Sequence, residues 1–63
     1  MSELKKLRLE KGYSQAELAQ LVGVTPKYIG FIENDERMPS LNVAGIIAKI
    51  FNVSIEEIFL SER

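Results

Sequence analysis

Residues 15–34 read QAELAQLVGVTPKYIGFIEN. Their apolar positions have the spacing that two short helices need when they cross steeply through a tight turn and bury a wedge between them. These positions are Leu18, Ala19, Val22, Val24, Ile29 and Ile32. We expect a small residue at Ala19 because the second helix packs over its Cβ. We expect Gly23 to form the turn, where a Cβ or a negative φ is awkward.

Both helices also carry start signals. Ser14 is a good N-cap for the first helix, and Glu17 three residues later completes a capping box. Leu21 continues the apolar face of this helix. Thr25 can cap the second helix, and Pro26 then stands at the first helical position, where its missing N–H costs nothing.

Caps and breakers predict three further helices, over residues 2–11, 40–51 and 54–60, with Gly12 ending the first of them. Residues 34–39 form a polar loop closed by a proline. The core-facing stripe of the helix over 40–51 is expected to be Leu41, Ala44, Ile47, Ala48 and Phe51. No stretch alternates with period two. The prediction is an all-α, compact five-helix bundle, a single domain over residues 1–63.

Composition excludes several kinds of chemistry. The 63 residues are 46% hydrophobic and 27% charged and contain no Cys and no His. Thiol and imidazole catalysis and ordinary zinc sites are therefore absent, and we expect no enzyme, no metal, no cofactor and no small-molecule ligand. The longest apolar run, Val43 to Ala48, is far shorter than the ~20 residues of a membrane helix. A cytoplasmic, nucleoid-associated protein without a membrane partner is expected.

Residues 15–34 and their surroundings resemble the lambda-repressor/Cro-type (Xre-like) helix-turn-helix family of bacterial and phage transcription regulators. Arg8 and Glu33 match a family pair whose ion pair ties the first helix to the third. The family's loop signature resembles the stretch Ile32-Glu33-Asn34 followed by Arg37, Pro39, Ser40 and Leu41, and its closing helix resembles residues 51–59. The resemblance implies a lambda-repressor-like fold, with the helix-turn-helix formed by the second and third helices over 15–34.

In this family the third helix lies in the DNA major groove and the second crosses the backbone. The resemblance then places at the bases Thr25, Pro26, Lys27, Gly30 and Phe31. Lys27 can donate to guanine O6 and N7, while Thr25 and Phe31 offer apolar surface to thymine methyl groups. Gly30, without a side chain, allows close approach to the bases. The alternatives are an ordinary exposed lysine, a helix-packing glycine and a protein-binding aromatic patch.

The expected phosphate contacts are Ser14, Gln15, Tyr28, Asn34 and Arg37. A helix N-terminus such as that at Gln15 offers free N–H groups and a positive dipole end. Asp35 and Glu36 depart from the family, which usually has glycine and a basic residue at these two positions. Binding to double-stranded DNA is therefore expected to depend strongly on base contacts and dimerisation rather than on charge.

A second apolar stripe on the helix over 40–51 is a candidate homodimer surface. It comprises Val43, Ile46 and Ile50, with Ile58 or Leu60 from the last helix. The alternative is that Val43 and Ile50 touch the last helix and leave Ile46 alone exposed. The sequence thus predicts a sequence-specific regulator, a repressor, that binds a palindromic operator as a homodimer. A protein-interaction module on the same fold, an antitoxin or co-regulator, is the competing interpretation.

Overall fold

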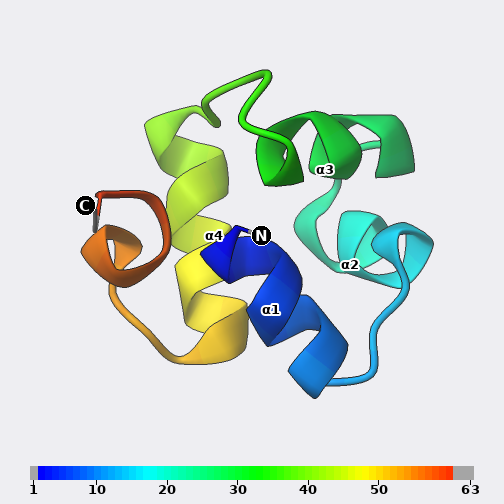
Figure 1. The fold of residues 1–63 in the computed structure, drawn as a ribbon, viewed down its shortest axis with the longest axis horizontal. Coiled ribbons are helices and arrows are strands. Elements are labelled where there is room, and N and C mark those ends of the chain that lie inside the picture. The colour runs from blue at the N-terminus through cyan, green and yellow to red at the C-terminus, as the bar shows by residue number, and fades with distance from the viewer. Residues whose placement is uncertain (1, 61–63) are drawn as a thin grey trace.

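The computed structural model describes residues 2–60, and all regular structure in this range is helical. The helices are α1 (Glu3–Glu10), α2 (Gln15–Val22), α3 (Pro26–Glu33), α4 (Leu41–Phe51) and η1 (Glu56–Leu60), a short helix with the wider turns of a π-helix. Figure 1 shows α1 in the middle, with the α2–α3 pair on one side and α4 and η1 on the other. The predicted all-α, five-helix architecture is confirmed. No helix among these residues is long and apolar enough to cross a membrane.

Hydroxyl caps begin the helices. In each case the side-chain oxygen accepts a hydrogen bond, 3.0–3.2 Å long, from the backbone N–H three residues later. The capping residues are Ser2, Ser14, Thr25, Ser40 and Ser54. Glu17 and Glu57 complete capping boxes, since each carboxylate accepts a 2.8 Å bond from the backbone N–H of its serine. Such a cap stabilises a helix by about 1 kcal/mol.

The four α-helices all end through the same device, a residue in the left-handed backbone region. These residues are Gly12 (φ 77°), Gly23 (φ 90°), Asp35 (φ 61°) and Asn52 (φ 57°). The following N–H then bonds to a carbonyl five residues back, as Val24 does to Ala19 at 3.0 Å. A Cβ added at Gly23 meets nothing within 4 Å. The backbone angle, and not a lack of space, is therefore what favours glycine in this turn.

The core lies between α1, the α2–α3 pair, α4 and η1. Its buried apolar side chains are Leu4, Leu18, Ala19, Val22, Ile29, Ile32, Ala44, Ile47, Ala48, Phe51 and Ile58. Each fully buried leucine or isoleucine contributes about 1.5–3 kcal/mol relative to an exposed one. The α2 helix packs against α3 and α4, and α1 packs against α3 and η1. The α2–α3 pair is thus packed against the rest of the chain on its inner side.

Two leucines that the sequence assigns to inward faces are exposed instead. Leu21 is 54% exposed and Leu41 is 78% exposed. Successive helical residues are about 100° apart, so Leu18, Val22 and Ala19 span one side of α2, and Leu21 falls beyond the Leu18 edge, away from Ala19. Leu41 is the first residue of α4, one turn before Ala44, where burial begins. The expectation of a core-facing Leu41 was wrong.

Candidate nucleic-acid interface

A buried ion pair joins α1 to the end of α3. The Arg8 Nε donates to Glu33 Oε2 at 2.6 Å, and Nη2 donates to Oε1 at 3.2 Å. The remaining guanidinium nitrogen, Nη1, donates to the carbonyl oxygen of Tyr13 at 2.8 Å. Arg8 is 6% exposed and Glu33 is 5% exposed. The pair therefore has the structural position that the resemblance implies.

The same carboxylate also holds Gln15, the first residue of α2. Gln15 Nε2 donates to Glu33 Oε1 at 3.1 Å, so α1, α2 and α3 all meet at Glu33. Gly30 lies on the α2 side of α3, because a Cβ built there would be 3.6 Å from Gln15 Nε2. We call Arg8, Glu33 and Gln15 the Glu33 network. It fixes the orientation of α3 relative to the two preceding helices.

The start of α3 is open to solvent. Thr25, Pro26 and Lys27 are exposed, and the Thr25 hydroxyl oxygen accepts a 3.1 Å bond from the N–H of Tyr28. Of the other expected base contacts, Gly30 and Phe31 are half-buried. The opposite side of α3 carries the buried Ile29 and Ile32. The helix therefore presents its N-terminal turns outward while its apolar face is fixed in the core.

Phe31 lies beside two cations from different elements. Lys27 Nζ is 5.9 Å from the centre of the Phe31 ring, and Arg37 Cζ is 5.6 Å from it. Both distances are within the range of cation–π attraction. We call Lys27, Phe31 and Arg37 the Phe31 cluster. The i, i+4 spacing of Lys27 and Phe31 is a sequence signal for the first contact, whereas the second has no local signal in the sequence.

The expected phosphate contacts differ in how many of their polar groups remain available to bind a phosphate. Ser14 uses both its N–H and its hydroxyl oxygen in the capping box, and the Glu17 carboxylate lies there. Gln15 has one amide hydrogen held by Glu33. Tyr28 is half-buried and packs against the core. Asn34 and Arg37 are exposed.

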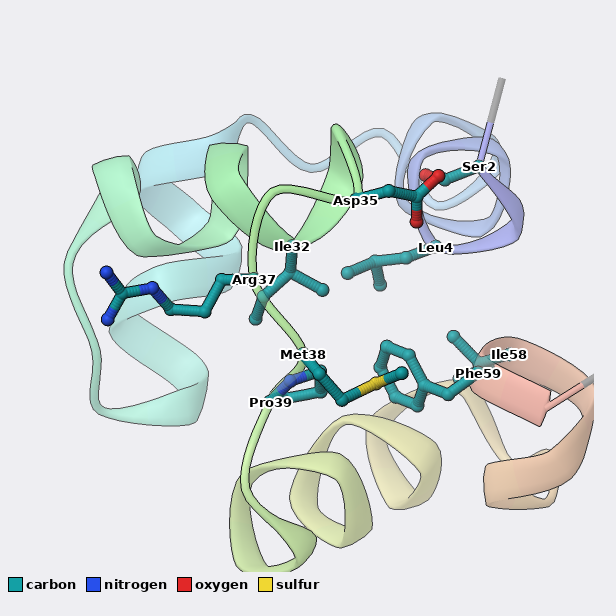
Figure 2. A pocket seen from close by; sticks show the side chains of 9 residues that line it. All are labelled: Ser2, Leu4, Ile32, Asp35, Arg37, Met38, Pro39, Ile58 and Phe59. Carbon is teal, nitrogen blue, oxygen red and sulfur yellow. The ribbon is translucent and has the colours of Figure 1, made fainter.

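The loop after α3 separates its charges. A cavity of about 170 Å³ lies between this loop, the start of α1 and η1. Figure 2 shows Asp35 at the rim of the cavity beside Ser2, with Met38 and Phe59 on the far wall. The Arg37 side chain leaves the loop on the side opposite to Asp35 (Figure 2). Opposite charges only two residues apart in sequence thus point apart.

The candidate dimer surface is less exposed than the sequence indicates. Val43, Ile46 and Ile50 are half-buried and pack against the core. Ile58 is only 7% exposed, because α1 covers η1, and its place in the core leaves it unavailable to a partner. The side chain of Leu60 lies outside the described part of the structure. A shallow groove lined by Leu41, Gly45, Ile46, Lys49 and Ile55 remains open on α4.

The chain matches known proteins over most of its length. A helix-turn-helix family model matches residues 4–58. An uncharacterized HTH-type transcriptional regulator of Bacillus subtilis, YgzD, is 39% identical over 62 residues, which cover 98% of this chain and 94% of the relative.

Two solved structures share the fold. The restriction-modification controller protein C.AhdI from Aeromonas hydrophila has 36% identity and a TM-score of 0.79, with 89% of this chain and 85% of that chain covered. The N-terminal DNA-binding domain of SinR from Bacillus subtilis has 34% identity and a TM-score of 0.81, with 95% and 87% covered. The chain therefore belongs to the Cro/C1-type, Xre-like helix-turn-helix family of transcriptional regulators.

Proposed function

We propose that this chain binds double-stranded DNA sequence-specifically, with α3 in the major groove, and represses transcription as a homodimer on a palindromic operator. The exposed start of α3 carries this proposal, since Thr25, Pro26 and Lys27 face solvent on a helix whose other side is fixed in the core. The helix-turn-helix family supports it, as does the DNA-binding domain of SinR. The whole chain, residues 1–63, is proposed to act as one domain in the cytoplasm, at the nucleoid.

Lys27 is the residue most suited to read a base in this arrangement. It is exposed and can donate to O6 and N7 of guanine, the acceptors that guanine presents in the major groove. Thr25 and Pro26 offer their apolar surface beside it. Gly30 is proposed to bring the α3 backbone close to the base edges.

Phosphate binding is proposed to come from both ends of the α2–α3 pair. At the start of α2, the N–H groups of Gln15 and Ala16 are the donors that the capping box does not use. Gln15 keeps an amide hydrogen and its carbonyl oxygen for a phosphate or a water. At the other end, Asn34 and Arg37 are exposed on the loop after α3. These groups fix the position of α3 on the duplex without reading sequence.

A second copy of the chain is the proposed partner for the groove on α4. One domain reads too few base pairs to be selective in a genome, and a twofold dimer doubles the site. The exposed Leu41 and the half-buried Ile46 supply apolar surface at this groove, and Lys49 also lines it. Leu41 therefore takes the place of Ile58 in the proposed interface.

The test is selection from a random pool of double-stranded DNA. The enriched sequences are then titrated by fluorescence anisotropy at two salt concentrations, with an unrelated duplex as the control. We expect a palindromic winner, with half-site centres about one helical turn apart, that tolerates added salt. Binding that ignores sequence and disappears with salt contradicts the proposal.

The same fold could instead serve as a protein-interaction module. The exposed acids Asp35 and Glu36 favour this second candidate, because they lie in the loop next to α3 and repel phosphate. An antitoxin or co-regulator of this kind would enrich no duplex in the selection. It would also tolerate charge reversal at Lys27.

A further inference from the structure

We propose that Phe31 is a positioning residue, which holds Lys27 and Arg37 in place for DNA rather than reading a base itself. This role rests on the proposed function, and it changes the expectation that Phe31 contacts a thymine methyl group. The ring has a cation at 5.9 Å from its own helix and a second at 5.6 Å from the following loop. The half-buried aromatic side chain on α3 thereby has two partners within the protein.

The backbone brings Arg37 to this ring. Asp35 adopts a left-handed conformation with φ 61° and turns the chain back after α3. The N–H groups of Glu36 and Arg37 then both donate to the carbonyl oxygen of Phe31, at 2.8 and 3.3 Å. Arg37 is therefore held twice by one residue, through its main chain and through its guanidinium.

Lys27 reaches the ring for a simpler reason. Residues four apart on a helix are neighbours on its surface, so Lys27 and Phe31 meet without any help from the loop. Among the residues that the structure describes, neither Lys27 nor Arg37 forms an ion pair. The Phe31 ring is therefore the group that orients both of them.

A ring is well suited to hold a DNA-binding cation. A carboxylate partner would occupy the N–H donors and cancel the charge, whereas a guanidinium that lies against an aromatic face keeps its in-plane donors free for a phosphate. Against this ring, Arg37 also lies apart from the Asp35 carboxylate (Figure 2). In Figure 2 the Arg37 and Asp35 side chains leave the loop on opposite sides.

Removal of the Phe31 ring should weaken DNA binding by a measurable amount. Without the ring, Lys27 and Arg37 remain charged but must be ordered when DNA binds. We expect Phe31→Leu to weaken binding about tenfold, because two exposed cation–π contacts are lost. We also expect the slope of log affinity against log salt to fall by about 1 as the Arg37 phosphate contact is loosened. Phe31→Tyr keeps an aromatic face and should bind within about twofold of the parent.

A double-mutant cycle on the selected duplex separates positioning from base reading. Leucine can still touch a thymine methyl group, so direct reading predicts a small loss confined to one base pair. Positioning predicts that Phe31→Leu has little further effect once Arg37→Ala and Lys27→Ala are present. Full additivity in that background, with an unchanged salt slope, overturns the role of Phe31. Thermal unfolding followed by circular dichroism checks that each variant is folded.

A measurement without DNA tests the geometry by itself. In the free protein, the ring current of Phe31 should shift the NMR signals of the Arg37 and Lys27 side-chain methylene protons, and Phe31→Leu should remove these shifts. A protein that binds its duplex but lacks the shifts overturns the positioning role alone. A protein that shows the shifts but selects no duplex overturns the proposed function, and with it the role of Phe31 in DNA binding.

Discussion

Two charged clusters flank the last turns of α3, and they hold their charges in opposite ways. The ion pair of the Glu33 network is buried, and Arg8 Nε, Nη1 and Nη2 each donate to an oxygen atom of the protein. The Phe31 cluster is at the surface, where a ring contacts two cations and cancels neither charge. Charge that holds helices together is neutralised inside the protein, whereas charge left for a partner is only oriented.

The difference follows from solvation. A buried ion is strongly penalised unless hydrogen bonds replace its water, and among the described residues no buried side-chain polar atom lacks a partner. An exposed cation keeps its water and needs no such replacement. Substitutions in the Glu33 network should therefore change stability, and substitutions in the Phe31 cluster should change binding.

The largest effect is expected from Arg8→Ala. This change leaves the Glu33 carboxylate buried without its cation, and breaking such a pair destabilises a protein by about 3–5 kcal/mol. A domain of this size is stable by only about 5 kcal/mol, so much of the population should unfold. Urea denaturation followed by circular dichroism measures the change.

Lys5→Ala is the matched control, because Lys5 is an exposed cation on the same helix. It should change the free energy of unfolding by less than about 0.5 kcal/mol. An Arg8→Ala protein with the parent's denaturation midpoint would show that the ion pair does not hold α1 to α3.

Lys27→Glu should leave stability intact and strongly weaken DNA binding. Lys27 is exposed in the first turn of α3, where a negative charge is favourable to the helix dipole. A lost guanine contact and the reversed charge beside phosphates should reduce affinity by about 3 kcal/mol, more than a hundredfold. Fluorescence anisotropy on the selected duplex measures it.

The control for this charge reversal is Lys5→Glu, which makes the same change at an exposed lysine of α1, a helix to which no DNA contact is assigned. It should bind the duplex nearly as well as the parent. If Lys27→Glu folds normally and still binds with the parent's affinity, Lys27 does not read the operator.

Helix starts could be predicted because their signals are local. The capping boxes of Ser14 and Ser54 depend on residues three apart in sequence, and the structure contains both. Gly23 is similar, since a left-handed turn favours glycine whatever surrounds it. The Arg8–Glu33 pair came from family resemblance, as a contact 25 residues apart has no local signal.

The remaining features depend on where neighbouring elements lie. Periodicity gives a helix an apolar arc but does not say which edge of the arc is covered, nor where along the helix the cover begins. Leu21 lies beyond the covered edge of α2, and Leu41 lies one turn before the buried part of α4. Arg37 meets Phe31 only because Asp35 turns the chain back with a left-handed backbone. The sequence shows that Asp35 stands where the family usually has glycine, but it does not show that the backbone turns back at this residue.

Asp35→Gly should therefore stabilise the protein by about 0.5–1 kcal/mol. A non-glycine residue with positive φ is strained, and glycine relieves that strain although it also loosens the unfolded chain. Replacing Asp35 with glycine also removes a carboxylate two residues from Arg37, so DNA affinity should rise by a few-fold. Asp35→Asn separates the two effects, because asparagine removes the charge but keeps a side chain that tolerates this conformation. If Asp35→Gly and Asp35→Asn have the same stability, the left-handed backbone at residue 35 is not strained.

The smallest effect is expected at Gly30, which lies between the two clusters. An added Cβ would be 3.6 Å from the Gln15 amide nitrogen, an ordinary contact, so the free protein has room for alanine. Alanine is the better helix former, and Gly30→Ala should raise stability by about 0.5 kcal/mol. We nevertheless expect weaker DNA binding, because a methyl group there would hold α3 away from the base edges.

Opposite signs in the two measurements are what assign Gly30 to DNA rather than to packing. Thermal unfolding gives the stability, and anisotropy on the selected duplex gives the affinity of the same sample. If alanine instead destabilises the protein, contact with Gln15 explains the glycine, and Gly30 belongs with the Glu33 network. If stability rises and affinity is unchanged, α3 does not approach the bases at this residue. The part of α3 that contacts the bases would then end one turn nearer the start of the helix, at Lys27.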